Sequence, residues 1–192
     1  RLSALGPRVP SSEAIEEAAR ILAAAKNPIA IVKASGRDPE AVRPLVALAE
    51  AIGMPVFDQW HTHVNFPQNH PLHLGYDTSP YLDEADVIVV LESDVPWFPK
   101  VKAPRPDATM IQIASDPLFA RYPIRGFPVD VALAGTPRLT LAALAEAVRR
   151  KGVDGKAMET RRARWEAEHR KLREAWATRA RAVQADRPVK MA

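Results

Sequence analysis

Ser35, Gly36 and Arg37 follow a short apolar run and precede a helix-like segment, the position at which many α/β domains bind phosphate groups. Backbone N–H groups at the start of a helix bind a phosphate closely where several glycines let the chain approach it. Gly36 is the only glycine in the turn from Lys33 to Arg37. The turn is therefore a weak candidate for a nucleotide site, and an ordinary connection between a strand and a helix is the favoured interpretation.

Polar residues also follow two later apolar runs, at residues 92–94 (Glu-Ser-Asp) and at Asp116. Ligands of open parallel sheets bind at the carboxyl ends of the strands. Ser93 and Asp116 therefore join the earlier turn as candidates for a vestigial nucleotide site. The carboxylates on either side of Ser93 would repel a diphosphate, so we expect no FAD here. An exposed Trp97-Phe98 pair next to them favours a contact with neighbouring domains instead.

Four histidines fall within one Pro-bearing loop between Trp60 and Ser79. A structural zinc site usually adds cysteines at a fixed spacing, and this chain has no cysteine. The nearby carboxylates are Asp58 and Asp77. We therefore expect no metal site and interpret the loop as one that packs between domains. The four histidines are His61, His63, His70 and His73.

The composition of the 192 residues limits the class of protein. Hydrophobic residues make up 47% and charged residues 26% of the chain, which excludes a wholly disordered protein. No apolar run approaches the roughly 20 residues that span a bilayer, so we expect no membrane protein. The absence of cysteine excludes disulfides and thiolate catalysis and is compatible with the cytoplasm. Since the sequence opens on Arg1, we interpret it as a piece of a longer protein.

Positive charge is concentrated in the last quarter of the chain. From Arg149 to Ala192 there are 14 Lys and Arg and 6 Asp and Glu, which indicates a boundary near Gly152. A helix is predicted from Lys156 to about Ala185, with an apolar stripe that we expect to dock on another domain. Glutamates lie three or four residues from its arginines, as in helix-stabilising pairs, so nucleic-acid binding is disfavoured. The stripe consists of Trp165, Leu172 and Trp176.

Short apolar runs alternate with amphipathic segments through the rest of the chain. This alternation predicts a Rossmann-like parallel α/β sheet with helices on both faces. Helices are predicted at 13–26, 39–52 and from Pro137 onwards, with Asp38 as a cap, and one helical turn at 81–85. Strands are predicted at 29–32, 55–57, 87–91, 110–113 and 129–133.

Several of these segments, in order, resemble the central domain of thiamine-diphosphate-dependent enzymes of the acetolactate synthase and pyruvate decarboxylase superfamily. The loop at 66–75 (FPQNHPLHLG) is similar to the family's FP-x-x-HPL-x-x-G motif. The other matching segments are 27–32 (NPIAIV), 48–56 (LAEAIGMPV), 82–91 (LDEADVIVVL) and 111–117 (IQIASDP), with Tyr122-Pro123 and Gly135 after them.

The resemblance implies a parent enzyme that uses thiamine diphosphate and Mg²⁺ on 2-oxo acids. In this family the activating glutamate and the Gly-Asp-Gly…Asn metal motif belong to two flanking domains, and neither occurs here. The resemblance thus implies a scaffold with no catalytic residue of its own. We expect it to assemble with flanking thiamine-binding domains, in a homodimer or homotetramer of the full-length enzyme.

The expected organisation is a linker at 1–10, a central α/β domain at 11–152 and a basic helical linker at 153–192, leading to a further domain. On its own, the chain is expected to fold, to be colourless, and to bind neither thiamine diphosphate with Mg²⁺ nor FAD. The main alternative is a module that binds FAD, ADP or CoA. A sirtuin-like domain is excluded, because its Gly-Ala-Gly loop and four-cysteine zinc site are missing.

Overall fold

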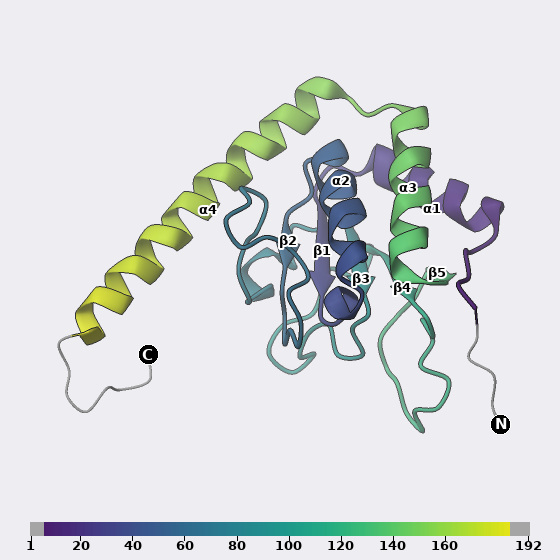
Figure 1. Cartoon of the computed structure of the whole chain (residues 1–192), viewed down its shortest axis with the longest axis horizontal. Helices are drawn as coiled ribbons and strands as arrows, with labels where there is room; N and C mark the ends of the chain where they lie inside the picture. The colour runs from purple at the N-terminus through teal and green to yellow at the C-terminus, as the bar shows by residue number, and fades with distance from the viewer. Residues whose placement is uncertain (1–5, 185–192) are drawn as a thin grey trace.

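The computed structural model describes residues 6–184 and has a five-stranded parallel sheet at its centre (Figure 1). The strand order is β2-β1-β3-β4-β5, and every neighbouring pair is parallel. This confirms the predicted α/β class. The strands are β1 (Pro28–Val32), β2 (Val56–Phe57), β3 (Val87–Leu91), β4 (Thr109–Ala114) and β5 (Val131–Ala134).

The central strands are covered on both faces. All five residues of β1 and of β3 are buried, and the two strands pair in register, with Ala30 opposite Val89. β5 lies at one edge, and its burial alternates with exposure. Continuous runs of apolar residues form central strands such as β1 and β3, because the side chains on both faces of these strands are buried. The core therefore lies in and around β1, β3 and β4.

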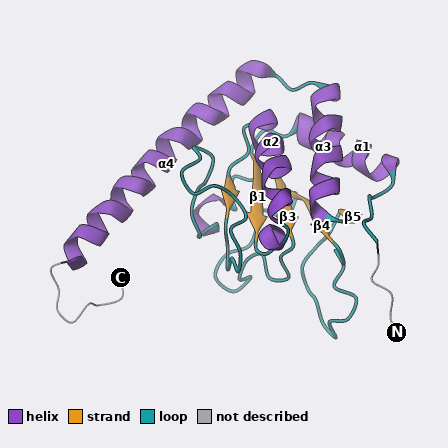
Figure 2. Cartoon of the chain, in the orientation of Figure 1, coloured by secondary structure: helices purple, strands orange, loops and turns teal. Residues whose placement is uncertain are grey.

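Three α-helices pack together beside the sheet. Figure 2 shows α2 (Val42–Ile52) and α3 (Pro137–Lys151) crossing in front of the strands, and α3 also packs against α1 (Ser12–Ala24). Ser11 caps α1 by accepting a hydrogen bond from the Ala14 N–H. The chain reaches α2 through the 3₁₀ turns η1 (Ser35–Arg37) and η2 (Pro39–Ala41).

The connections from β2 to β3, β3 to β4 and β4 to β5 are long loops. Their regular helical part is the 3₁₀ turn η3 (Ser79–Tyr81). The connection from β2 to β3 passes β1 in the direction opposite to that of the β1–α2–β2 connection. Because such crossovers are right-handed, it lies on the face of the sheet opposite α2. The second face of the sheet is thus covered mainly by loops, so the helices predicted for both faces gather mainly on one of them.

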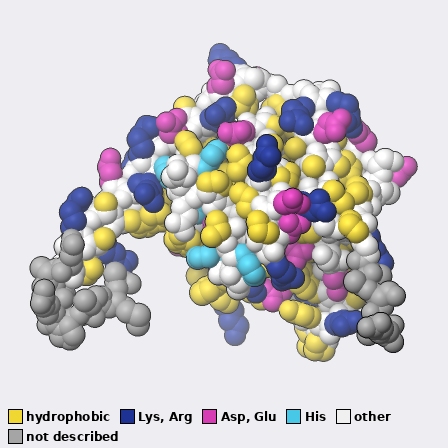
Figure 3. Space-filling model, viewed as in Figure 1, with side chains coloured by type: hydrophobic (Ala, Val, Ile, Leu, Met, Phe, Trp, Pro, Cys, Tyr) yellow, Lys and Arg dark blue, Asp and Glu magenta, His cyan; other side chains and the backbone are white. Residues whose placement is uncertain are grey.

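The last element, α4 (Gly155–Gln184), is a helix of 30 residues. It begins beside the amino ends of the strands and extends away from the body at its far end (Figure 1). Its outer side carries Lys and Arg mixed with Asp and Glu (Figure 3). Within residues 6–184, no helix combines the length and the apolar character needed to cross a membrane.

Candidate functional site

The carboxyl ends of β1 and β3 form the place where an open sheet of this order normally binds a ligand. The chain leaves β1 toward β2 and leaves β3 in the opposite direction, which opens a crevice between the two strand ends. Here Lys33 follows β1 and Asp94 follows β3. The Lys33 Nζ and Asp94 Oδ1 atoms lie 2.5 Å apart. An internal ion pair therefore spans the crevice.

Asp94 is held by a second group from the loop after β4. The Tyr122 hydroxyl donates a hydrogen bond to Asp94 Oδ2 at 3.0 Å. Burial raises the pKa of Asp94, but the hydrogen bonds from Lys33 and Tyr122 outweigh it, so the pKa lies below its ordinary value. The same hydrogen bond to Asp94 raises the pKa of Tyr122. The carboxylate is ionised and fully engaged near neutral pH.

The turn predicted as a remnant phosphate loop is occupied by Asn65. The Gly36 N–H donates to Asn65 Oδ1 at 2.8 Å, and the Ser35 hydroxyl donates to the same atom at 3.2 Å. Asn65 is fully buried, and its Nδ2 donates to the Lys33 carbonyl at 3.0 Å. A Cβ on Gly36 would lie 2.0 Å from the Val64 carbonyl oxygen. Gly36 is thus needed for the approach of the chain's own loop.

A cleft of about 260 Å³ lies next to this turn, between the ends of β1, β3, β4 and β5. Ser35 and Arg37 line it, as does Glu92. Glu92 Oε1 accepts a hydrogen bond from the Ser115 N–H at 2.8 Å. The Thr136 hydroxyl, also in the lining, accepts one from the Arg8 N–H. The lining therefore places the carboxylates of Asp38 and Glu92 beside the guanidinium of Arg37, and the excess of negative charge disfavours a diphosphate.

The other three candidates, Gly36, Ser93 and Asp116, lie outside the lining of this cleft. Ser93 is fully buried, and its hydroxyl has no hydrogen-bond partner among the described residues. Asp116 is exposed and accepts a hydrogen bond from the Ala120 N–H at 3.0 Å within its own turn. Of the five candidates, only Ser35 and Arg37 therefore share the cleft, while Gly36 binds Asn65 and the other two lie apart.

The four histidines of the long loop do not converge. His73 is fully buried, with Nε2 3.2 Å from Asp58 Oδ2. His70 Nε2 lies 3.2 Å from Glu50 Oε1 on α2. Over residues 6–184, no cluster of three or more His, Cys, Asp or Glu could hold a metal ion. His61 stacks on Tyr76, and His63 is exposed.

The expectation of an exposed Trp97-Phe98 pair is wrong for Trp97. Only 4% of Trp97 is exposed, and its ring packs edge-on against Phe127 at 5.2 Å between centroids. Phe98 is 49% exposed, as expected. A large aromatic ring is buried where a second ring offers an edge-to-face partner, and Phe127 comes from a loop 30 residues away in sequence.

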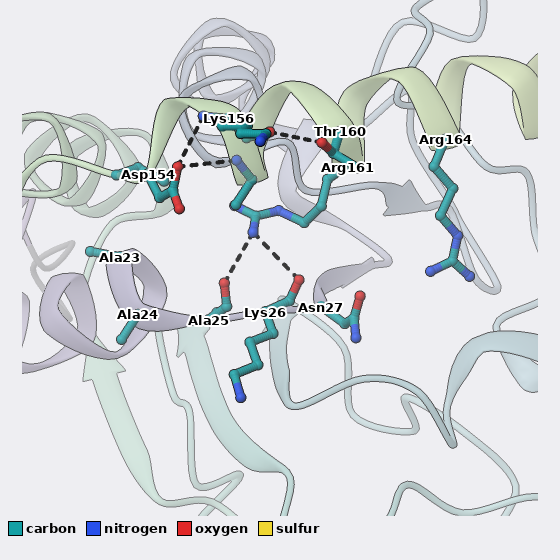
Figure 4. Close-up of a pocket in the computed structure, with 12 residues that line it drawn as sticks. Ala23, Ala24, Ala25, Lys26, Asn27, Asp154, Lys156, Thr160, Arg161 and Arg164 are labelled. Carbon is teal, nitrogen blue, oxygen red and sulfur yellow. Dashed lines mark hydrogen bonds between the residues drawn. The ribbon is translucent and has the colours of Figure 1, made fainter.

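At the opposite ends of the strands, Arg161 of α4 joins three parts of the chain. Its Nε and Nη2 donate to the Ile52 carbonyl at 3.0 and 2.7 Å, and Nη1 donates to the Ala25 carbonyl at 3.2 Å. Nη1 also lies 3.4 Å from the Lys26 carbonyl (Figure 4). These carbonyls belong to the last turns of α1 and α2 or follow them, where partners are otherwise lacking. Burial lowers the pKa of Arg161.

A groove of about 600 Å³ runs beside Arg161, between the end of α1 and the start of α4 (Figure 4). Its floor is built from small side chains, including Ala24 and Ala157. Arg164, at its edge, donates a hydrogen bond to Glu84 at 2.6 Å. The groove is thus part of the surface along which α4 meets the body.

The apolar stripe of α4 docks on the α/β body of the same chain, which corrects the expectation that it docks on another domain. Trp165 is 2% exposed and packs edge-on against Tyr81 at 5.6 Å. The His169 Nδ1 lies 2.7 Å from the His73 carbonyl oxygen. Further along, Trp176 stacks on Tyr76 at 5.7 Å. The spacing of these residues keeps them on one side of the helix.

Together these features define a parallel α/β domain of strand order 2-1-3-4-5, with its ligand crevice filled by its own side chains. Residues 15–144 match the family described as "Thiamine pyrophosphate enzyme, central domain". The chain belongs to this family, which confirms the resemblance found in the sequence.

Two curated proteins are similar to parts of the chain. Sulfoacetaldehyde acetyltransferase from Castellaniella defragrans is 37% identical over 87 residues, which are 42% of this chain and 14% of that protein. Acetolactate synthase from Mycobacterium avium is 28% identical over 155 residues, which are 76% of this chain and 24% of that protein. The matched residues thus span a quarter or less of each of these relatives.

Two solved structures share the fold. Benzoylformate decarboxylase from Polynucleobacter necessarius aligns with a TM-score of 0.64 and 21% identity, over 77% of this chain and 29% of that chain. A putative thiamin diphosphate-dependent enzyme from Mycobacterium smegmatis aligns with a TM-score of 0.63 and 23% identity, over 77% and 30%. At this level of identity, the likeness supports the fold.

Proposed function

We propose that this chain is the central, non-catalytic domain of an enzyme that uses thiamine diphosphate and Mg²⁺ to act on 2-oxo acids. Its task is to hold the flanking cofactor domains at a fixed spacing. The family match and the names of the similar proteins support this reaction class. The observation that carries the scaffold role is the strand-end crevice filled by Lys33, Asp94 and Tyr122.

The described residues do not fit thiamine diphosphate with Mg²⁺. Such a site needs a carboxylate for the aminopyrimidine and oxygen ligands for the metal, all converging on one cleft. The acidic side chains at the carboxyl edge are each engaged: Asp94 with Lys33, Glu92 with the Ser115 N–H, and Asp116 with the Ala120 N–H. We therefore assign the cofactor to the flanking domains and derive no chemical step from this chain.

FAD is also a poor fit for the carboxyl edge. The Gly36 N–H, which a diphosphate would need, donates to Asn65. Glu92 would face the phosphates in the cleft. A nucleotide would have to displace Asn65 from its hydrogen bonds, including the one to the Lys33 carbonyl, and would leave buried groups unpaired.

The extent of the domain is part of the proposal. The predicted divisions at 10 and 152 stay predictions, and the anchoring of α4 favours counting that helix as part of the domain through Trp176. The assembly into a homodimer or homotetramer and the location in the cytoplasm also remain predictions, and they are supported by the family alone.

A thermal-shift experiment on the 192-residue chain tests the proposal. We expect no rise in melting temperature with thiamine diphosphate and Mg²⁺, or with FAD, while the complete polypeptide is stabilised by the first pair. A ligand at 100 times its dissociation constant adds about 2.7 kcal/mol to the folded state, a shift that is easily measured. A rise in the melting temperature of the 192-residue chain with thiamine diphosphate would contradict the scaffold role. A rise with FAD or ADP would favour the nucleotide-binding alternative.

A further inference from the structure

Large hydrophobic side chains are exposed on the loops that follow β2, β3 and β4. These loops start at the carboxyl ends of the strands and reach the lower end of the body in Figure 1. Figure 3 shows hydrophobic side chains at that end. Ile124 is 88% exposed and Val101 is 73% exposed. Large exposed apolar patches mark interaction sites, and the exposed side chains of these three loops are the candidates for one here. We name it the apolar edge surface, and it consists of Trp60, Val64, Phe98, Val101, Leu118 and Ile124.

The three loops support one another beneath this surface. The exposed rings of Trp60 and Phe98, from different loops, meet edge to face at 5.6 Å. The buried Trp97 packs on Phe127 and so joins the loop after β3 to the loop after β4. Tyr122 adds its hydrogen bond to Asp94 between the same two loops. The exposed side chains therefore stand on an ordered base, which lowers the entropy cost of binding.

The same loops contain the backbone strain of the domain. Among residues 6–184, the non-glycine residues with positive φ are Trp60 at 54°, Glu92 at 48° and Phe119 at 49°. All three follow the carboxyl ends of strands. A left-handed backbone conformation costs free energy in a residue as large as Trp. Residues in such conformations are concentrated at functional sites. Trp60 combines this conformation with a side chain that is 59% exposed.

The course of the chain indicates what covers this surface. Arg8 is fixed at the carboxyl end of β5 by two hydrogen bonds with Thr136, so a segment that precedes it enters at this edge. The last turn of α4 lies toward the same side of the molecule, at the bottom of Figure 1. The solved relatives are more than three times as long as the part that this chain covers. Lys100 and Arg121, beside the surface, have no ion-pair partner within residues 6–184.

We propose that the apolar edge surface is the seat of a thiamine-binding domain of the same polypeptide. The face that this domain presents is apolar, with acidic side chains opposite Lys100 and Arg121. The inference rests on the proposed function, because it takes the neighbouring domain from there. It adds which edge of the sheet carries the domain and which side chains it covers.

Hydrogen exchange followed by mass spectrometry tests the inference, with the 192-residue chain compared to the complete polypeptide. We expect amides at 97–101 and 118–124 to exchange about tenfold or more slowly in the complete polypeptide. Amides at 152–155, at the opposite edge, serve as the reference. If the loop amides exchange hydrogen at the same rate in both proteins while the complete polypeptide binds thiamine diphosphate, the inference is overturned. Failure of the complete polypeptide to bind thiamine diphosphate overturns the proposed function, whatever the exchange shows.

A matched pair of variants separates docking from folding. The edge variant carries Trp60→Asn, Phe98→Ser and Ile124→Ser, and the control carries Arg43→Ser, Ala142→Ser and Arg162→Ser at exposed positions of α2, α3 and α4. Both should melt within about 2 °C of the parent in the short chain, because exposed positions contribute little. In the complete polypeptide, only the edge variant should lose loop protection.

The outcomes of this pair are decisive. Protection that is the same in the edge variant and the control would show that the neighbouring domain does not rest on these side chains. A concentration-dependent dimer of the short chain in sedimentation, lost only in the edge variant, would assign the surface to a second copy and overturn the inference.

Discussion

The amino ends of the strands are closed by α4, whereas the loops at their carboxyl ends leave large hydrophobic side chains in water. At the amino edge, Arg161 binds the carbonyls that end α1 and α2. At the carboxyl edge, Trp60 and Ile124 are more than half exposed. Unpaired carbonyls and the negative ends of helix dipoles attract a cation strongly over a short range. The chain satisfies that demand itself and leaves the apolar edge surface for a partner.

The amino and carboxyl edges of the sheet also use charged side chains in different ways. Arg161 is buried and bonds to uncharged carbonyls, so its side chain fixes the position of α4. Lys33 and Asp94 neutralise each other in the crevice where a ligand would bind. Charged side chains thus order both edges, but at the carboxyl edge the half-buried Lys33–Asp94 pair fills the usual ligand site and leaves the loop tips free.

The largest effect is expected at Trp165, which is 2% exposed under α4. Trp165→Ala should lower the free energy of unfolding by about 3–5 kcal/mol, because it removes a buried ring and leaves a cavity. Urea denaturation measures the loss. Arg170→Ala is the control, since Arg170 is exposed and, within the described residues, pairs only with Glu166 on its own helix. A loss as small as that of the control would show that α4 does not close the amino edge.

Arg161→Met tests the carbonyl contacts themselves. The methionine keeps much of the apolar stem but leaves the Ile52 and Ala25 carbonyls without the guanidinium donors. We expect a loss of about 2–3 kcal/mol, the range for buried groups deprived of a charged partner. Limited proteolysis should cut α4 faster in this variant. Unchanged cleavage and unchanged stability would contradict the role given to Arg161.

At the carboxyl edge, Asp94→Asn tests the filled crevice through pH. The pKa of Asp94 lies below its ordinary value of 3.8, so the unfolded state binds the proton more readily. The stabilisation from Asp94 is therefore present above pH 4, approximately, and is lost as the pH falls through the lowered pKa. The difference in stability between the parent and the variant should shrink over that acid range. A difference that is independent of pH would contradict the ion pair with Lys33.

The smallest effect is expected at Trp60, and its sign is opposite. Trp60→Asn replaces a bulky residue at a φ of 54° by one that adopts this conformation more easily. The variant loses the edge-to-face contact with Phe98, so the net gain in stability should be only about 0.5 kcal/mol. Thermal melting of the short chain measures it. A clear loss of stability would mean that the Trp60 ring supports the fold of the isolated chain.

The fold was predictable from local signals that repeat through the chain. The runs at 29–32 and 87–91 became β1 and β3 nearly residue for residue, because four or five consecutive apolar residues between polar turns fit a covered parallel strand. The helix predicted from residue 13 begins at Ser12, one residue earlier, and the predicted cap Asp38 accepts a hydrogen bond from the Glu40 N–H. Such features depend on neighbours within four residues, which a sequence displays directly.

The site depends on contacts between distant residues, and these escaped prediction. Asn65 gave no signal, since an asparagine in a Pro-bearing loop is ordinary, yet it takes the Gly36 N–H from 29 residues away. Arg161 was hidden in a charged run whose other arginines face water, although its spacing of four from Trp165 places it on the apolar stripe. That spacing is the one signal that could have revealed it. Trp97 was predicted as exposed because its partner Phe127 is distant in sequence.

The 30 residues of α4 make it an arm as well as a closure. Its last aromatic contact with the body is that of Trp176 with Tyr76. At 1.5 Å per residue, the helix from Trp176 to Gln184 extends about 12 Å beyond this contact. A tilt of roughly 10° at Trp176 would move the far end by about 2 Å, and the loss of one residue in between would rotate that end by about 100°. The direction of the far end of α4 therefore depends on how firmly the helix is held at its last contact with the body. Insertions and deletions between Trp176 and Gln184 should change the direction in which the arm points, while leaving the stability of the sheet intact.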